Sequence, residues 1–136
     1  MNLASYDTRE KQEAGVWTDI VDPGGYEVIM QVKVAGRDSK IIKRRQQEIA
    51  KKRQGKKKIT PAEEEADALE TVCYATLSWR MLDDKTKQPI EKETCLDGEE
   101  ELEPTFENVK KIYQKYPFIA EQVIEVIGSR ELFLES

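Results

Sequence analysis

The clearest pattern of hydrophobic and polar positions lies between Tyr26 and Ala35, where Tyr, Val, Met, Val and Val occupy every second position. This two-residue period is typical of a β-strand that buries one face. A shorter extended pattern over 16–22 precedes it. The Asp-Pro-Gly-Gly segment between the two favours a turn, because Pro fixes one φ and Gly accepts a positive φ. We therefore predict an antiparallel β-hairpin of strands 16–22 and 26–35, which must pack on helices or further strands to be stable.

The middle of the chain follows the helical period of three to four residues. Asp38 or Ser39 is placed to cap a weakly amphipathic helix over 40–53, and 54–58 is expected to be a flexible loop. A Thr-Pro-Ala-Glu start at 60–63 predicts a second helix that runs to about Trp79. Its broad apolar face makes it the predicted central core helix. The next segments are predicted to be a loose hairpin or a loop over 78–95 and an acidic loop over 96–102.

The C-terminal stretch 104–134 holds all three Phe residues and two apolar stripes at helical spacing. The first stripe consists of Phe106, Val109, Tyr113 and Tyr116, and the second of Ile119, Ala120, Val123, Ile124 and Ile127. Pro117 separates the two helices, because proline disfavours α geometry in the residue before it. Gly128 is placed to end the second helix, and a last turn follows. Both stripes must be buried against the rest of this chain or against another chain.

Together these elements predict an α+β fold that is mostly helical, with an N-terminal antiparallel β-hairpin followed by about four to five helices. At 136 residues the chain is expected to form a single domain. Its predicted parts are an N-terminal arm (1–14), the hairpin (15–36), a basic helix with a flexible loop (40–58) and a helical core (61–134).

The absence of histidine is the most informative feature of the composition. It excludes Ser-His and Cys-His nucleophiles and zinc sites that contain histidine. Cys73 and Cys95 lack Cys-x-x-Cys spacing and are expected to be free thiols, with Cys73 acting as a small buried hydrophobe. The acidic residues of 97–103 are expected to be solvated rather than catalytic. We therefore expect no catalytic, cofactor-binding or metal-binding residues, and no enzyme.

Charge is distributed unevenly. The net charge is −5, yet 40–58 holds ten Lys and Arg residues and only one acid, Glu48. The plain interpretation is a solvated helix face and loop. The alternatives are a contact surface for an acidic protein and, less favoured, a nucleic-acid site in a small regulator, since cations neutralise phosphates. Nucleic acid is the weakest of the three because the segment has no aromatic residue to stack on a base.

No apolar run is long enough to cross a membrane, and the first residues lack the apolar region of a signal peptide. The expected compartment is the cytoplasm.

Seven short segments carry a resemblance to a known family. They are Tyr6-Asp-Thr-Arg, Glu13-Ala-Gly-Val-Trp17, Ala35-Gly-Arg-Asp-Ser39, Ala75-Thr-Leu-Ser-Trp79, Phe106-Glu-Asn-Val-Lys110, Tyr116-Pro-Phe-Ile-Ala-Glu-Gln-Val123 and Leu132-Phe-Leu134. In this order they resemble the tail assembly chaperones of bacteriophages with long, non-contractile tails and of their prophages.

The resemblance implies a non-enzymatic protein of the host bacterial cytoplasm that is not expected in the mature virion. Its partners would be the tape measure protein, which it coats and keeps soluble, and tail tube subunits, which it recruits. Homo-oligomers are also implied, whereas a membrane is not and nucleic acid is not favoured.

We hypothesise a partner-binding surface on the C-terminal stretch, formed by Phe106, Tyr113, Phe118, Val123, Leu132, Phe133 and Leu134. Within it, 106–127 are expected mainly to complete the core, and 132–134 are the stronger candidates for partner contact.

Overall fold

The structure, a computed structural model, describes residues 2–56 and 58–134. Its elements in chain order are η1 (Leu3–Tyr6), α1 (Arg9–Ala14), β1 (Val16–Val21), β2 (Val28–Val34), α2 (Lys40–Arg53), α3 (Pro61–Ala75), β3 (Thr76–Met81), β4 (Cys95–Asp97), β5 (Glu100–Leu102), α4 (Phe106–Lys115), α5 (Pro117–Gly128) and η2 (Arg130–Phe133). The class is α+β and rich in helix, as predicted. The predicted flexible loop 54–58 includes Lys57, which lies outside the described residues.

The predicted hairpin is confirmed. β1 and β2 pair antiparallel, with Val16 opposite Val34 and Ile20 opposite Met30. At the turn, Gly25 has a φ of +76°, a value that suits glycine, and the Tyr26 amide donates to the Asp22 carboxylate. On one face of the pair, Ile20, Met30, Val32 and Val34 are buried, as the two-residue period predicts. Tyr26, which the period placed on the same face, lies before β2 and is exposed.

The chain after the hairpin is not helical throughout, and the predicted end of the second helix is wrong. α3 ends at Ala75, and Thr76 begins β3, which pairs antiparallel with β2 in a sheet of order β1-β2-β3. β3 satisfies the free edge of β2, whose amides and carbonyls would otherwise lack strand partners. Trp79 of β3 is fully buried, and its indole N–H donates to the Leu102 carbonyl at 2.9 Å.

The segment between β3 and α4 also differs from the prediction. The predicted acidic loop 96–102 contains the short antiparallel pair β4–β5. One alternative predicted for 78–95 is a loose hairpin. Of this hairpin the structure forms a single antiparallel bridge, between Leu82 and Pro89.

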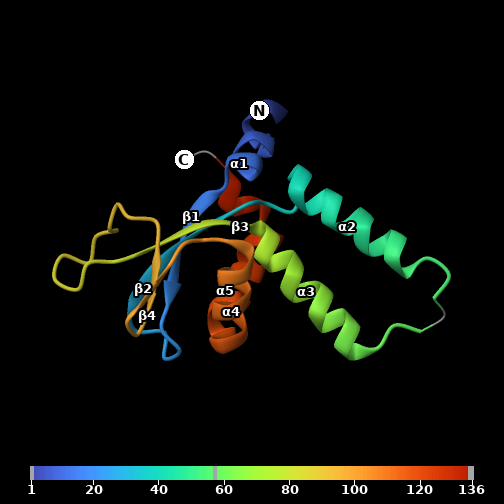
Figure 1. Cartoon of the computed structure of the whole chain (residues 1–136). Coiled ribbons are helices and arrows are strands. Elements are labelled where there is room, and N and C mark those ends of the chain that lie inside the picture. The colour runs from blue at the N-terminus through green and yellow to red at the C-terminus, as the bar shows by residue number, and fades with distance from the viewer. Residues whose placement is uncertain (1, 57, 135–136) are drawn as a thin grey trace.

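The core lies between the sheet and the two C-terminal helices. α5 packs on β1 and β2, and α4 packs on α3 and α5 (Figure 1). Only the second half of α3 belongs to this core, since Val72, Cys73 and Ala75 are buried whereas Ala62 and Ala66 are exposed. The prediction of a central core helix therefore holds only for that half.

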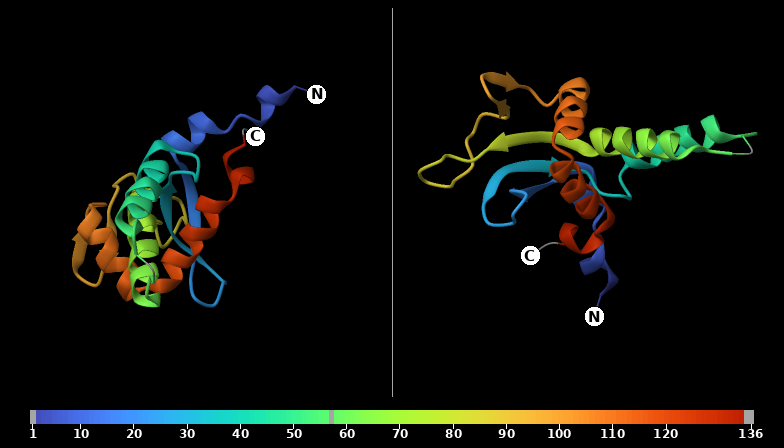
Figure 2. Two further views of the ribbon diagram at one scale, coloured as in Figure 1. Left: turned by 90° about the vertical axis from the view of Figure 1, so that its right-hand side faces the viewer. Right: turned by 90° about the horizontal axis from the view of Figure 1, so that it is seen from below.

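The first half of α3 pairs with α2 outside the core. The two helices lie side by side and extend away from the sheet, as the views in Figures 1 and 2 show. This pair of helices, α2 and α3, is called the arm below. Of the apolar residues of α2, only Ile42 is fully buried. Among the described residues, no helix combines the length and the apolar character that crossing a membrane requires.

The N-terminal residues before β1 are attached to the body through Gln12, which is fully buried. Its side-chain oxygen accepts from the Asp38 amide at 2.6 Å, and its side-chain nitrogen donates to Thr8 Oγ1 and Asp38 Oδ2. The Gly36 amide donates to the Gln12 carbonyl at 3.0 Å. A Cβ at Gly36 would overlap the Gln12 side chain, so this contact requires glycine.

We predict that Gly36→Ala destabilises the protein by about 1–3 kcal/mol, the usual range for forcing extra atoms into a packed site. The free energy of unfolding in urea measures this effect, and limited proteolysis should show earlier cleavage within 2–14. Gly128→Ala is the matched control, because a Cβ at Gly128 meets no atom within 4 Å. Equal stability of the two variants would contradict the packing of Gln12 on Gly36.

Candidate partner-binding site

The seven residues predicted for partner binding do not share a surface. Tyr113, Val123 and Phe133 are at most 1% exposed and belong to the core. This agrees with the expectation that 106–127 mainly complete the core, but it differs from the expectation that Phe133 is available to a partner. The three side chains point inward because each lies on the buried side of its helix or turn; the Tyr113 hydroxyl, for example, lies 2.6 Å from Thr76 Oγ1.

The remaining four residues are at least partly accessible. Phe106, Phe118 and Leu134 are half-buried, and Leu132 is 53% exposed. The Phe106 ring packs on Tyr74 with centroids 4.8 Å apart, and Phe118 packs edge-on against Tyr116. Leu132 is therefore the residue of the 132–134 end that is most available to a partner.

We predict that Phe133→Ala lowers the free energy of unfolding by about 3–5 kcal/mol, the range for removing a buried aromatic side chain. Leu132→Ala is its control, and as a surface change it should stay within about 0.5 kcal/mol of the native protein. Urea denaturation measures both. Similar losses for the two variants would contradict the burial of Phe133.

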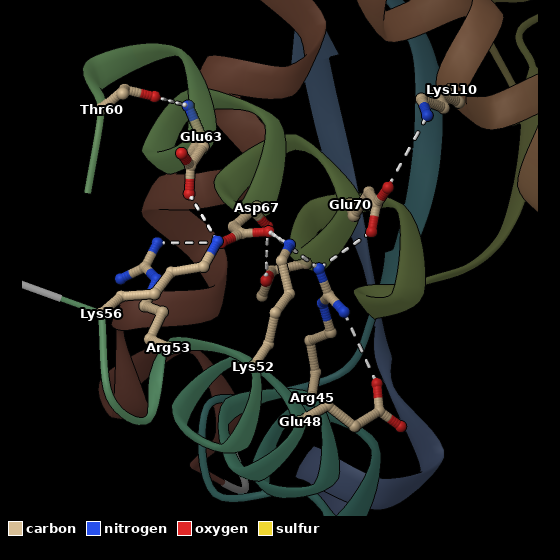
Figure 3. Close-up of polar contacts among 11 residues, drawn as sticks. Arg45, Glu48, Lys52, Arg53, Lys56, Thr60, Glu63, Asp67, Glu70 and Lys110 are labelled. Carbon is tan, nitrogen blue, oxygen red and sulfur yellow. Dashed lines mark hydrogen bonds and ion pairs between the residues drawn. The ribbon is translucent and has the colours of Figure 1, made fainter. Parts of the chain in front are cut away.

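The basic helix α2 uses several of its cations within the chain. Asp67 of α3, only 3% exposed, accepts from Lys52 Nζ at 2.7 Å and from Arg53 Nη2 at 2.9 Å, and Arg45 Nη2 lies 3.5 Å away. Figure 3 shows the three cationic side chains reaching from α2 to this one carboxylate. A buried carboxylate is costly unless it is paired, and here it is paired three times.

Further ion pairs extend this network along the arm. Arg45 also pairs with Glu70 at 2.9 Å, Glu70 with Lys110 of α4 at 3.7 Å, and Lys56 with Glu63 at 3.3 Å (Figure 3). The sequence predicted a basic segment but not its partners on α3, which are Glu63, Asp67 and Glu70.

Five other cations of the segment, by contrast, make no ion pair with the described residues. They are Lys40, Lys43, Arg44, Lys51 and Lys58. A phosphate backbone would thus meet fewer free cations than the sequence count indicates.

The cations around Asp67 also determine its ionisation. The hydrogen bond from Lys52, followed by that from Arg53, holds the pKa of the carboxyl below its usual range, although burial acts in the opposite direction. Asp67 is therefore ionised at neutral pH, and the cations of α2 have a permanent partner.

The lowered pKa predicts a pH dependence for the packing of the arm. A carboxyl whose pKa is lower in the folded state contributes stability above its unfolded pKa, about 3.9, and loses it as the pH falls through the folded value. Asp67→Asn should therefore destabilise the arm clearly at pH 7 and hardly at all below the folded pKa.

Hydrogen exchange of α2 amides at a series of pH values measures this difference. Asp84→Asn is a suitable control, because Asp84 is exposed and makes no ion pair with the described residues. A constant difference between native protein and Asp67→Asn down to pH 2 would contradict the role of the charge.

Next to this network lies a groove of about 550 Å³ between the arm and α5. Its apolar lining consists of Ile49, Ala68, Val72, Ile124 and Ile127. Polar and charged residues complete the groove, namely Arg37, Gln46, Arg53, Glu64, Asp67 and Thr71, with Gly128 at the end of α5. Ile124 is 48% exposed although it belongs to an otherwise well-buried helix.

Sequence reasoning placed Ile124 on the second C-terminal stripe but did not identify the groove. The available signal was that this stripe, Ile119 to Ile127, is wider than one buried helix face needs. Ile49, which also lines the groove, comes from a segment far away in the sequence.

A larger hollow of about 920 Å³ lies between the N-terminal residues and the start of α2. It is lined almost entirely by charged side chains of both signs, including Arg9, Glu13, Asp38 and Lys43. It lacks the apolar floor that would hold a helix or a drug-like ligand.

The structure also gives the positions of the residues considered for chemistry. Cys73 and Cys95 are free and buried, and burial raises the pKa of both thiols to about 11, which makes them poor nucleophiles. Within 2–56 and 58–134, no three Cys, Asp or Glu side chains are grouped so that they could hold a metal ion.

The fold and site thus define a small α+β protein with a helical arm, an internally paired basic helix and an apolar groove. Comparison of the chain with protein-family models, curated proteins and solved structures finds no match.

Proposed function

We propose that this protein is a non-enzymatic phage tail assembly chaperone that binds an apolar helix of the tape measure protein in the groove between the arm and α5. It keeps that client soluble in the host bacterial cytoplasm, helps to recruit tail tube subunits, and is not retained in the mature virion. The observation that carries the proposal is the exposed Ile124 in a groove lined with aliphatic side chains.

The groove has the properties that helix recognition requires. An amphipathic client helix buries its apolar face in a hydrophobic groove through side chains spaced three, four and seven residues apart. The volume of about 550 Å³ lies within the range of about 300–1,000 Å³ that is usual for binding pockets. Ile49 of α2 and Ile124 of α5 both line the groove, so it offers an inserted helix apolar side chains from two different helices.

The composition of the surface is also suited to this role. Long apolar helices aggregate when their faces are exposed, and a partner that covers them must itself remain soluble. Charged residues make up 36% of the chain, and the net charge of −5 opposes self-aggregation of the complex. The order of the seven segments that resemble the tail assembly chaperones gives independent support.

The proposal predicts a loss of client capture when the groove carries a charge. Ile124→Glu should weaken capture of the tape measure protein in a co-expression pull-down by about tenfold to a hundredfold, since burial of one aliphatic side chain contributes about 1.5–3 kcal/mol. Leu96→Glu is a matched control, because Leu96 of β4 is 52% exposed, close to the 48% of Ile124, and lies outside the groove.

Circular dichroism of each variant checks that it is folded. A substitution at Phe133 would not serve, because that residue is buried and its loss tests folding. Capture that is unchanged in Ile124→Glu would refute the groove as the site. A native protein that captures no tape measure protein, and leaves it as insoluble as when it is expressed alone, would refute the function itself.

A further inference from the structure

The three-stranded sheet has a second face that α5 does not cover. Across β1, β2 and β3, residues that lie directly opposite one another point to the same side. The row Thr18, Val32 and Trp79 points into the core. The two rows on the opposite face are Trp17, Lys33 and Ser78, and Asp19, Gln31 and Arg80. All of these except Ser78 are half-buried or exposed, so this face is accessible.

On this open face, Arg80 is held in a fixed orientation. Its guanidinium carbon lies 3.9 Å from the centroid of the Trp17 ring, and its Nε donates to Gln31 Oε1 at 2.9 Å. The Gln31 amide in turn donates to Asp19 at 2.8 Å. Ring and hydrogen bond together fix the plane of the guanidinium. Its two terminal nitrogens make no hydrogen bond or ion pair with the described residues.

A second cation lies at the same ring. Lys33 Nζ is 5.9 Å from the Trp17 centroid and, like the terminal nitrogens of Arg80, has no ion-pair partner among the described residues. Two like charges beside one aromatic ring repel each other, and an anion bound between them would relieve this repulsion.

Ser78 provides an independent observation at this place. It lies opposite Lys33 on the open face, is only 7% exposed, and its hydroxyl has no hydrogen-bond partner. Buried hydroxyl groups are almost always paired, so this unpaired hydroxyl, which shares the open face with two cations, indicates a ligand that accepts a hydrogen bond from it.

We propose that Arg80, Lys33, Ser78 and Trp17 form a binding site for the carboxylate of an acidic side chain on a partner protein. The two terminal nitrogens of Arg80 donate to the two carboxylate oxygens, while Lys33 Nζ and Ser78 Oγ donate to the same group. The Trp17 ring supports the methylene groups of the acidic side chain.

Charge favours a carboxylate over a phosphate. The open face carries two cations, Lys33 and Arg80, and one acid, Asp19, so its net charge balances a single negative charge rather than a phosphate dianion. The net charge of −5 of the whole chain also disfavours a polyanion such as a nucleic acid. The site shares no residue with the groove, and it does not depend on the function proposed above.

Titration of the ¹⁵N-labelled protein with a blocked Ala-Glu-Ala peptide, which carries a single carboxylate, tests the proposal, with a blocked Ala-Gln-Ala peptide as the uncharged control. The indole N–H signal of Trp17 should shift in a saturable way with the Glu peptide only. The indole signal of Trp79 is an internal reference, because it is buried and bonded to Leu102.

Three variants locate the ligand contacts. Arg80→Lys keeps the charge but loses the planar fork, and it should weaken binding about tenfold. Ser78→Ala should also weaken binding, while its melting temperature stays unchanged or rises, because it removes an unpaired buried hydroxyl. If Ser78 only supported the fold, Ser78→Ala would lower the melting temperature together with the affinity for the peptide. Lys51→Gln, an exposed change on α2, should bind like the native protein.

The proposal is overturned if the Glu peptide causes no saturable shift, or if Arg80→Lys and Ser78→Ala bind it as the native protein does. An equal response to inorganic phosphate at the same concentration would assign a phosphate site instead. A different outcome is a Trp17 signal that shifts with protein concentration in the absence of any peptide. If that shift is lost in Arg80→Lys, the site binds a second copy of this chain rather than another protein.

Discussion

The pairing of Val34 with Thr76 is the constraint on which the rest of the architecture depends. β3 must return antiparallel to β2 at the point where β2 ends, and the Ala35 amide donates to the Ala75 carbonyl at 2.9 Å. The residues between these points therefore leave the sheet and come back to it. Two helices of nearly equal length, 14 and 15 residues, are the compact way to do so, and they form the arm.

An arm of this kind has little access to the hydrophobic core, so other contacts must hold it together. α2 contributes only Ile42 as a fully buried apolar residue, and its main neighbour is α3. The buried carboxylate of Asp67 offsets this by pairing with cations at 2.7 and 2.9 Å. Removal of Asp67 would leave the cations that face it without this partner, so the network joins α2 to α3 where the core does not reach.

Local signals predicted the elements whose causes are local. The period of β2, the turn at Gly25, the helix starts at Ser39 (one of the two expected caps) and Thr60, and the break at Pro117 all have causes within a few residues. β3 was missed because its residues extend the apolar stripe of the preceding helix, and only pairing with the distant β2 makes them a strand. Likewise, helical spacing groups Val123 with Ile124 but does not show that the first faces the core and the second the groove.

The network at Asp67 and the groove beside Ile124 belong to one arrangement of the arm. Arg53 and Asp67 pair α2 with α3 at 2.9 Å, and both also line the groove, together with Ile49 of α2 and Ile124 of α5. An exposed aliphatic side chain such as Ile124 gains free energy when apolar surface covers it. Breaking the pair of a buried carboxylate is costly, because a charge is left unpaired away from water. A movement of α2 over Ile124 that separated Arg53 from Asp67 would therefore set these two effects against each other.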